Sequence, residues 1–358
     1  MNVLVTGSDG YIGAQLVPLL RERAHRVIGL DTGFYRDGRL YGRVLPTLTR
    51  IRKDIRRLTL EDVQGYDAVV HLAELSNDPL GEHSPALTFQ INHQGSLTLA
   101  RLCKAAGVPR FVYTSSCSVY GKGSDEIVSE ESPLNPQTAY AACKVLVERD
   151  VRALADDTFS PTFLRNATAF GPSPRMRFDI VLNNLAGLAW TTGTIALTSD
   201  GSPWRPLVHV LDIGEAIACV LEAPREAVHN QVFNVGNTRF NYRVRDIAQI
   251  VSDAFPGCAV TLGTADQDNR SYRVSFEKIH ACLPRFACRR DAEVGARELY
   301  TLFRRLGMSR DTFEFRAYTR LKQITHLQAT GQVDEELFWQ ASAAARSVIR
   351  QRDGNYVA

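Results

Sequence analysis

Short apolar runs alternate along the first two thirds of the chain with longer segments whose apolar residues recur at helical spacing. The runs NVLVTG, RVIGLD, AVVHLAE, RFVYTSS and PTFLRNA predict buried strands. Amphipathic segments between them, such as IGAQLVPLLRERA and the stretch from about Ala139 to Leu154, predict helices. This alternation predicts an α/β fold, with a doubly wound parallel sheet covered by helices on both faces.

The pattern becomes less regular after the Gly- and Pro-rich stretch GPSPRMR, and this change indicates a domain boundary. Residues 1–170 are predicted to form the larger domain, to which residues 206–237 return through RPLVHVLDIGEAIACVLEA and QVFNVG. Residues 171–205 and 238–358 are predicted to form a smaller, substrate-binding domain with a helical C-terminal extension. The polar, helical pattern of the extension leaves open whether it caps a substrate or contacts a partner chain.

Composition and charge exclude several classes of protein. A net charge of +3 over 358 residues is too small to indicate a nucleic-acid or membrane surface, and no apolar stretch reaches the length of a membrane span. The seven cysteines lack close pairs and metal-ligand spacing, so they are interpreted as free thiols in a reducing compartment. With no basic segment and apolar run at the start, the chain is expected to be cytoplasmic and to hold no metal.

The first strand is followed directly by TGSDGYIG, which places Gly7, Gly10 and Gly13 between a strand and a helix. In that context the glycines permit a tight turn, a close approach of the backbone to a diphosphate, and close helix packing. Asp31 ends the next strand at the distance expected for a carboxylate that binds a ribose 2′-hydroxyl. The motif therefore predicts a dinucleotide site and favours NAD over NADP, although Arg36 nearby keeps NADP open.

A second motif, TAYAACK, places Tyr140 and Lys144 four residues apart on one face of a predicted helix. It follows the glycine motif and the Ser-rich strand end YTSSCSVYG in the order typical of one family. From residue 1 to about residue 285 the chain resembles the extended short-chain dehydrogenase/reductase family, the nucleotide-sugar epimerases and dehydratases. The resemblance implies a Rossmann-type fold, bound NAD and a nucleotide-diphosphate sugar as substrate.

The resemblance also assigns roles in the reaction. Ser116 matches the catalytic hydroxyl, Tyr140 the general base that removes a proton from a sugar hydroxyl, and Lys144 the group that binds the nicotinamide ribose. A neighbouring ammonium also favours the phenolate form of the tyrosine.

Further positions match the family's binding residues. Cofactor contacts are expected at Gly7, Gly10, Tyr11, Ile12, Gly13, Asp31, Asp54, Ile55, Leu72, Ala73, Glu74, Asn92, Ser115, Tyr140 and Lys144. Asn92 matches a conformational anchor beside the active site. Substrate contacts are expected at Ser116, Thr168, Arg175, Arg177, Asn184, Leu185, Arg205 and Arg270. Guanidinium groups suit a diphosphate because they donate parallel hydrogen bonds.

The two residues after Ser116 bear on the type of reaction. The 4,6-dehydratases carry Asp-Glu there, and this chain has Cys117 and Ser118, neither of which is a strong acid or base at neutral pH. Elimination of water is therefore disfavoured, and epimerisation through transient oxidation of a secondary alcohol is favoured. Cys117 is kept as a catalytic candidate, with packing in the core as the other interpretation.

Two departures from the family pattern leave roles open. Glu74 stands where relatives usually have a small residue, and it could contact a sugar hydroxyl, act as a base or lie in solvent. Thr168 stands where many relatives have an asparagine that touches the substrate diphosphate. Arg175 and Arg177 could bind phosphate or lie on the surface.

The leading hypothesis is an NAD-dependent nucleotide-sugar epimerase. The alternatives are a 4-ketoreductase or dehydrogenase, a dehydratase that uses Glu74 or Cys117, and a non-catalytic NAD-binding regulator. The resemblance also implies a homodimer formed through the helices at about 92–106 and 139–154, both of which carry apolar residues at helical spacing.

Overall fold

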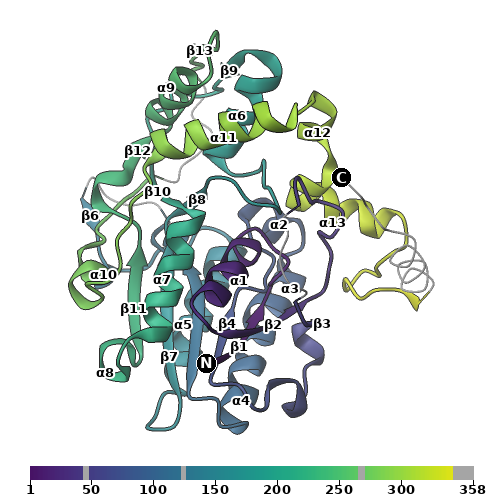
Figure 1. Cartoon of the computed structure of the whole chain (residues 1–358), viewed down its shortest axis with the longest axis vertical. Helices are drawn as coiled ribbons and strands as arrows, with labels where there is room; N and C mark the ends of the chain where they lie inside the picture. Colours follow the sequence, from purple (N-terminus) through teal and green to yellow (C-terminus); the bar gives the residue numbers. More distant parts are fainter. Residues whose placement is uncertain (43–47, 122–125, 265–270, 342–358) are drawn as a thin grey trace.

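A seven-stranded parallel sheet forms the centre of the larger lobe (Figure 1). The computed structural model describes residues 1–42, 48–121, 126–264 and 271–341. The sheet has the order β11-β7-β5-β4-β1-β2-β3, and all of its pairings are parallel. Its strands are β1 (Asn2–Thr6), β2 (Arg26–Asp31), β3 (Arg50–Arg52), β4 (Ala68–His71), β5 (Arg110–Ser116), β7 (Ser160–Asn166) and β11 (Gln231–Val235).

Helices cover both faces of this sheet, as the alternating pattern predicted. On one face lie α1 (Gly13–Glu22) and α7 (Val210–Glu222), and on the other α4 (Ser96–Ala105) and α5 (Ala139–Arg152). Successive strand residues alternate between the two cores, so Val3 and Val5 pack under α1 while Leu4 packs on the opposite side. The doubly wound fold is confirmed, and its strand order reverses between β1 and β4, where ligands bind in such sheets.

The smaller lobe lies beyond the carboxyl ends of these strands and has its own apolar core (Figure 1). Phe178, Phe255 and Phe303 lie in that core between three helices. The helices are α6 (Val181–Thr192), α9 (Val244–Ala254) and α11 (Ala292–Leu306). The small sheets hold β6 (Ile127–Val128), β8 (Thr168–Phe170), β9 (Thr194–Ala196), β10 (Trp204–His209), β12 (Asn241–Arg243), β13 (Ala259–Thr261) and β14 (Arg273–Val274).

Two parts of the chain differ from the expected division. The segment 206–237 was expected to rejoin the large sheet, but β10 pairs with β8 and β12 of the smaller lobe, while α7, α8 (Arg225–Val228) and β11 return. The extension was assigned to the smaller domain, whereas Ile324, Leu327 and Leu337 pack into the core of the larger lobe. The remaining domain boundaries stay a prediction.

The remaining elements are helical. They are η1 (Ile55–Arg57), η2 (Leu60–Val63), α2 (Asp78–His83), α3 (Pro85–Thr88), η3 (Phe89–Gly95), η4 (Cys117–Tyr120), α8 (Arg225–Val228), η5 (Thr238–Phe240), α10 (Glu277–Cys282), α12 (Arg310–Glu314), η6 (Arg316–Tyr318) and α13 (Arg320–Ala329). No helix within the described ranges is long and apolar enough to cross a bilayer.

Candidate active site

The loop between β1 and α1 forms a cradle that has no room for side chains at two of its glycines. Gly7 has a φ of +72°, and a Cβ there would lie 2.9 Å from the backbone of Leu72 and Ala73 at the end of β4. A Cβ on Gly13 would lie 2.3 Å from the carbonyl oxygen of Gly7. These close contacts hold the loop against β4 and against itself, and residues Gly10–Gly13 at the start of α1 line a cavity, a position that suits a diphosphate.

The end of β2 supplies the carboxylate expected for a ribose. Asp31 accepts hydrogen bonds from the backbone amides of Gly33 (2.7 Å) and Asp9 (3.0 Å), and burial raises the pKa of its carboxyl group. Asp54 lies in the same cavity and is held by the backbone and guanidinium of Arg56 at 2.8–3.0 Å. These contacts fix both carboxylates at one end of the cavity.

The residues after β4 form the opposite wall. Leu72, Ala73 and Glu74 line the cavity, as expected, together with Ile55. Asn92 does not line it: its fully buried side chain bonds the backbone nitrogen (2.8 Å) and oxygen (3.0 Å) of Leu75. Its assignment as a cofactor contact is therefore corrected to that of an anchor, which shapes the loop carrying Glu74.

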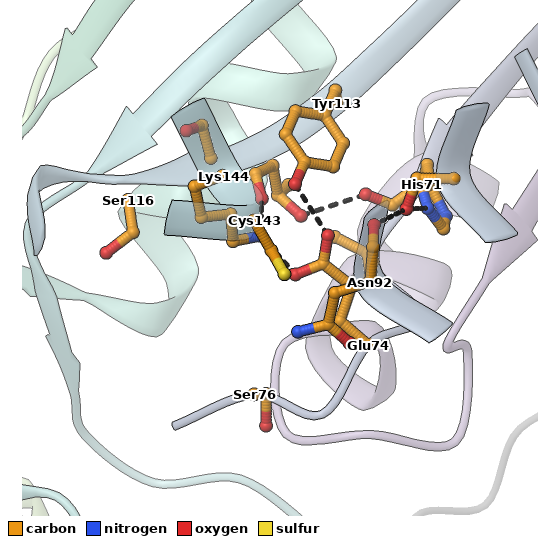
Figure 2. Close-up of polar contacts among 12 residues, drawn as sticks. His71, Glu74, Ser76, Asn92, Tyr113, Ser116, Cys143 and Lys144 are labelled. Carbon is orange, nitrogen blue, oxygen red and sulfur yellow. Dashed lines mark hydrogen bonds and ion pairs between the residues drawn. The ribbon is translucent and has the colours of Figure 1, made fainter. Parts of the chain in front are cut away.

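A buried ion pair joins this loop to α5 (Figure 2). Lys144 Nζ lies 2.5 Å from Glu74 Oε2, and the two side chains are 4% and 3% exposed. Tyr113 donates a hydrogen bond of 2.6 Å to Glu74 Oε1, and Lys144 also donates to the carbonyl oxygen of Thr114. Burial lowers the pKa of Lys144, but the Glu74 carboxylate, together with Tyr140 and Glu148, raises it above its usual value. Lys144 therefore stays protonated, and Glu74 is no solvated loop residue.

Tyr140 lies one turn before Lys144 on α5, and Thr138 caps the start of this helix by accepting a hydrogen bond from the amide of Ala141 at 3.2 Å. The Lys144 ammonium is 5.4 Å from the centre of the Tyr140 ring. Burial raises the pKa of the phenol, the ammonium opposes the rise, and the Glu74 carboxylate adds to it. A second cavity adjoins the first, and it is lined by Ser116, at the end of β5, together with Tyr140 and Lys144.

The structure places Cys117 away from both cavities, so its catalytic assignment is corrected. The side chain is 1% exposed, lies in the core under α7, and donates to the carbonyl oxygen of Arg165 at 3.2 Å. The turn of η4 directs residue 117 inward and residue 118 toward the second cavity, which Ser118 lines. Burial raises the pKa of the thiol well above its ordinary value, which excludes a thiolate at neutral pH.

The remaining expected cofactor contacts divide by the direction of their side chains. Tyr11 and Ile12 line the first cavity, and the hydroxyl of Tyr11 donates to the carbonyl oxygen of Gly171 at 2.7 Å. Ser115 borders the second cavity, but its hydroxyl donates to Glu148 in a buried network with Arg165.

Of the expected substrate residues, Ser116, Thr168, Arg177 and Arg205 line the second cavity. Three others do not, and these assignments are corrected. Arg175 donates to the carbonyl oxygens of Tyr35 and Arg36, Asn184 donates to that of Phe178, and Leu185 packs in the core of the smaller lobe. Arg270 lies outside the described residues.

Several cavity residues carried no motif that could have identified them. Ile180, Val181 and Tyr272 line the second cavity, and Tyr35 and Arg320 line the first. Val181 begins α6, and the GPSPRMR break that precedes the helix was a usable signal for its position. Arg320 comes from the extension, where no pattern indicated a ligand.

The two cavities meet at Ile12, Leu72, Glu74 and Arg177, so a dinucleotide in the first would present its reactive end to Tyr140 in the second. That layout places the chain in the extended short-chain dehydrogenase/reductase class, among the nucleotide-sugar epimerases and dehydratases. The model of the NAD dependent epimerase/dehydratase family matches residues 3–236, and the chain belongs to this family.

Relatives and solved structures agree with this membership. The chain is 30% identical over 264 residues to UDP-glucose 4-epimerase 4 of Oryza sativa subsp. japonica, covering 66% of this chain and 72% of the relative. It resembles the structure of MoeE5 in complex with UDP-glucose and NAD, at 28% identity and a TM-score of 0.73, over 86% of this chain and all of that one. It also resembles DesIV, a dTDP-glucose 4,6-dehydratase from Streptomyces venezuelae, at 25% identity and a TM-score of 0.75, over 87% and 100% of the two chains.

NAD is the cofactor of this family, and the residues of the first cavity fit it. The glycine cradle packs closely against β4 and brings the start of α1 to the cavity wall, and Asp31 is held for a ribose. Lys144 and Glu74 lie where this cavity opens onto the reactive residues.

Proposed function

We propose that the protein is an NAD-dependent epimerase of a nucleotide-diphosphate sugar. The observation that carries the proposal is that Ser116, Tyr140 and Lys144 share one cavity, while the residue after Ser116 points into the core. The place where a dehydratase of the 4,6 type would carry its Asp-Glu pair thus offers only the Ser118 hydroxyl.

The chain's own groups account for the proton transfers. The NAD cofactor, when bound, supplies the hydride acceptor and donor. Tyr140 takes the proton of the sugar hydroxyl and returns it when the alcohol is restored; the Lys144 ammonium opposes the rise in the pKa of Tyr140 that burial causes. Ser116 hydrogen-bonds the same oxygen. Arg177 and Arg205 border the cavity; Arg177 is paired with Asp179, and Arg205 is the residue proposed to bind the nucleotide diphosphate.

The test begins with the protein as purified. Denaturation and mass analysis identify the bound dinucleotide, and the native protein is then offered UDP-glucose and UDP-galactose without added cofactor. Conversion with unchanged substrate mass supports epimerisation. Turnover only with added NADH or NADPH would move the protein to the ketoreductases.

Two tyrosine variants distinguish an enzyme from a non-catalytic NAD-binding regulator. Tyr140→Phe should lower turnover about 10²- to 10⁴-fold and retain NAD, since the variant loses only the proton acceptor. Tyr120→Phe is the matched control, because its buried phenol contacts Asn234 (2.7 Å) and Arg165 outside both cavities. Equal activity of both variants would contradict the proposal.

Elimination of water is a second candidate that one observation favours. The Glu74 carboxylate lines both cavities and is paired with Lys144, so it places a base beside the reactive residues. A product lighter than the substrate by one water, abolished in Glu74→Gln, would establish this reaction.

Cytoplasmic location and a homodimer through α4 and α5 remain predictions. Fractionation of cells and the mass of the purified protein in solution test them.

A further inference from the structure

Arg320 is a buried cation that reaches the cofactor cavity from the C-terminal extension. It is the first residue of α13, is 3% exposed, and lines the cavity together with Gly10–Gly13 and Tyr35. Its guanidinium lies 3.9 Å above the centre of the Tyr35 ring. Its backbone amide donates to Asp179 Oδ2 at 3.0 Å, so the start of α13 is fixed and the side chain is directed at the cavity.

In the part of the chain that the structure describes, Arg320 differs from the other two cations that line this cavity in having no carboxylate partner. Lys53 is paired with Asp62 at 2.5 Å, and Arg177 with Asp179 at 2.8 Å. Among the described residues, the Arg320 guanidinium has no hydrogen-bond acceptor and no carboxylate within 4 Å. Burial, followed by the nearby Arg177, lowers the pKa of Arg320 to about 10, so the group is still a cation at neutral pH. An unpaired buried cation is costly unless a ligand supplies the counter-charge.

The extension that carries Arg320 is anchored to the loops of the adenosine end. Gln323 donates to the carbonyl oxygen of Phe34 at 2.9 Å, and Trp339 to that of Thr32 at 2.8 Å. The Phe338 ring lies 4.0 Å and 3.7 Å from the guanidinium carbons of Arg56 and Arg57, just after Asp54. Residues 320–339 thus hold the two loops that present Asp31 and Asp54 to the cavity.

We propose that Arg320 binds the diphosphate of NAD, and that residues 320–339 thereby retain the cofactor in the protein. The planar guanidinium suits phosphate oxygens, and the amides at the start of α1 border the same cavity. The inference does not depend on which sugar is the substrate or which reaction follows.

The test measures binding in Arg320→Gln and Arg320→Lys. Calorimetric titration of the NAD-free proteins should show that Arg320→Gln weakens NAD and ADP about 10- to 100-fold, since charge-assisted hydrogen bonds are lost. Arg320→Lys should weaken them less. Adenosine, which lacks phosphate, should bind all three proteins equally. An unchanged affinity for ADP, or equal losses for ADP and adenosine, would overturn the proposal.

Thermal unfolding supplies a second, independent readout. Without NAD, Arg320→Gln should melt at the same temperature as the parent or higher, because the variant removes an uncompensated charge. With saturating NAD its rise in melting temperature should be smaller. Arg316→Gln is the matched control, since Arg316 lies four residues earlier, pairs with Asp37 at 3.1 Å and lines neither cavity. A lower melting temperature of NAD-free Arg320→Gln would assign Arg320 a structural role instead.

Discussion

The ion pair between Glu74 and Lys144 allows a prediction of stability that can be worked out from its geometry. At 2.5 Å and an effective dielectric constant of about 20, the attraction is about 7 kcal/mol. Removing two ions from water costs several kcal/mol for each, so the pair as a whole contributes little. Either ion alone would keep its desolvation cost and lose the attraction.

A double-mutant cycle measures this coupling. Glu74→Gln keeps an acceptor for Tyr113, so its expected loss of about 3 kcal/mol in the free energy of unfolding arises from the stranded ammonium. Lys144→Met should lose a similar amount, and the double variant should lose at least about 2 kcal/mol less than the sum. The assay is urea unfolding of the NAD-free proteins, because bound cofactor adds stability of its own.

The dependence of these stability losses on pH provides a further check of the double-mutant cycle. Burial raises the pKa of Glu74 in the folded protein above its unfolded value, so its protonated form is favoured by folding. The associated stability is present below the unfolded pKa and is lost as the pH rises through the folded one. Lys144→Met removes the cation that offsets this rise, and its deficit should be larger at about pH 8 than at about pH 5.

The control makes the same change in an exposed pair. Glu314→Gln breaks the Arg310–Glu314 pair, whose atoms are 2.7 Å apart on the surface, and should change stability far less. If the losses in unfolding free energy of the Glu74 and Lys144 single variants simply add in the double variant, the proposed coupling between the two charges is refuted.

Three further outcomes follow from the site. Cys117→Ala should lose about 1 kcal/mol of stability with turnover unchanged within about twofold, because the thiol packs in the core; a large loss of turnover at full stability would reinstate it as catalytic. Gly13→Ala should purify without NAD, since its Cβ would lie 2.3 Å from the carbonyl oxygen of Gly7; retained NAD would contradict the cradle. The acidic limb of kcat/KM should move to lower pH in Glu74→Gln, because the carboxylate raises the pKa of Tyr140; an unmoved limb would assign that ionisation to another group.

Features set by local periodicity were predictable from the sequence. The strands and flanking helices follow from apolar runs and helical spacing, and Tyr140 and Lys144 share a helix face because they are four residues apart. The glycine cradle followed from three glycines between a strand and a helix.

The predicted roles of individual side chains were wrong where a local turn of the backbone decides whether a side chain points into the core or into a cavity. At the end of β5 the chain turns into η4, so Cys117 points inward although its neighbours reach the cavity. In GPSPRMR, Arg177 reaches the cavities and Arg175 turns to the loop after β2. The sequence carries no periodic signal for such turns.

Packing between distant segments was also unpredictable. The contact of Trp339 with Thr32 joins residues from opposite ends of the chain, and neither residue lies in a motif. The placement of Arg320 depends on these contacts, which explains why composition and spacing gave no indication of it.

The joining of the first and last thirds of the chain around one cavity has a consequence for biosynthesis. The cradle at Gly7–Gly13 leaves the ribosome before the wall that includes Arg320 and the anchor at Trp339 has been translated. A nascent chain therefore presents an incomplete nucleotide site through most of its synthesis. Because residues 320–339 must dock before the site is whole, loading of the cofactor is expected to follow the synthesis of this segment and to report on its correct folding.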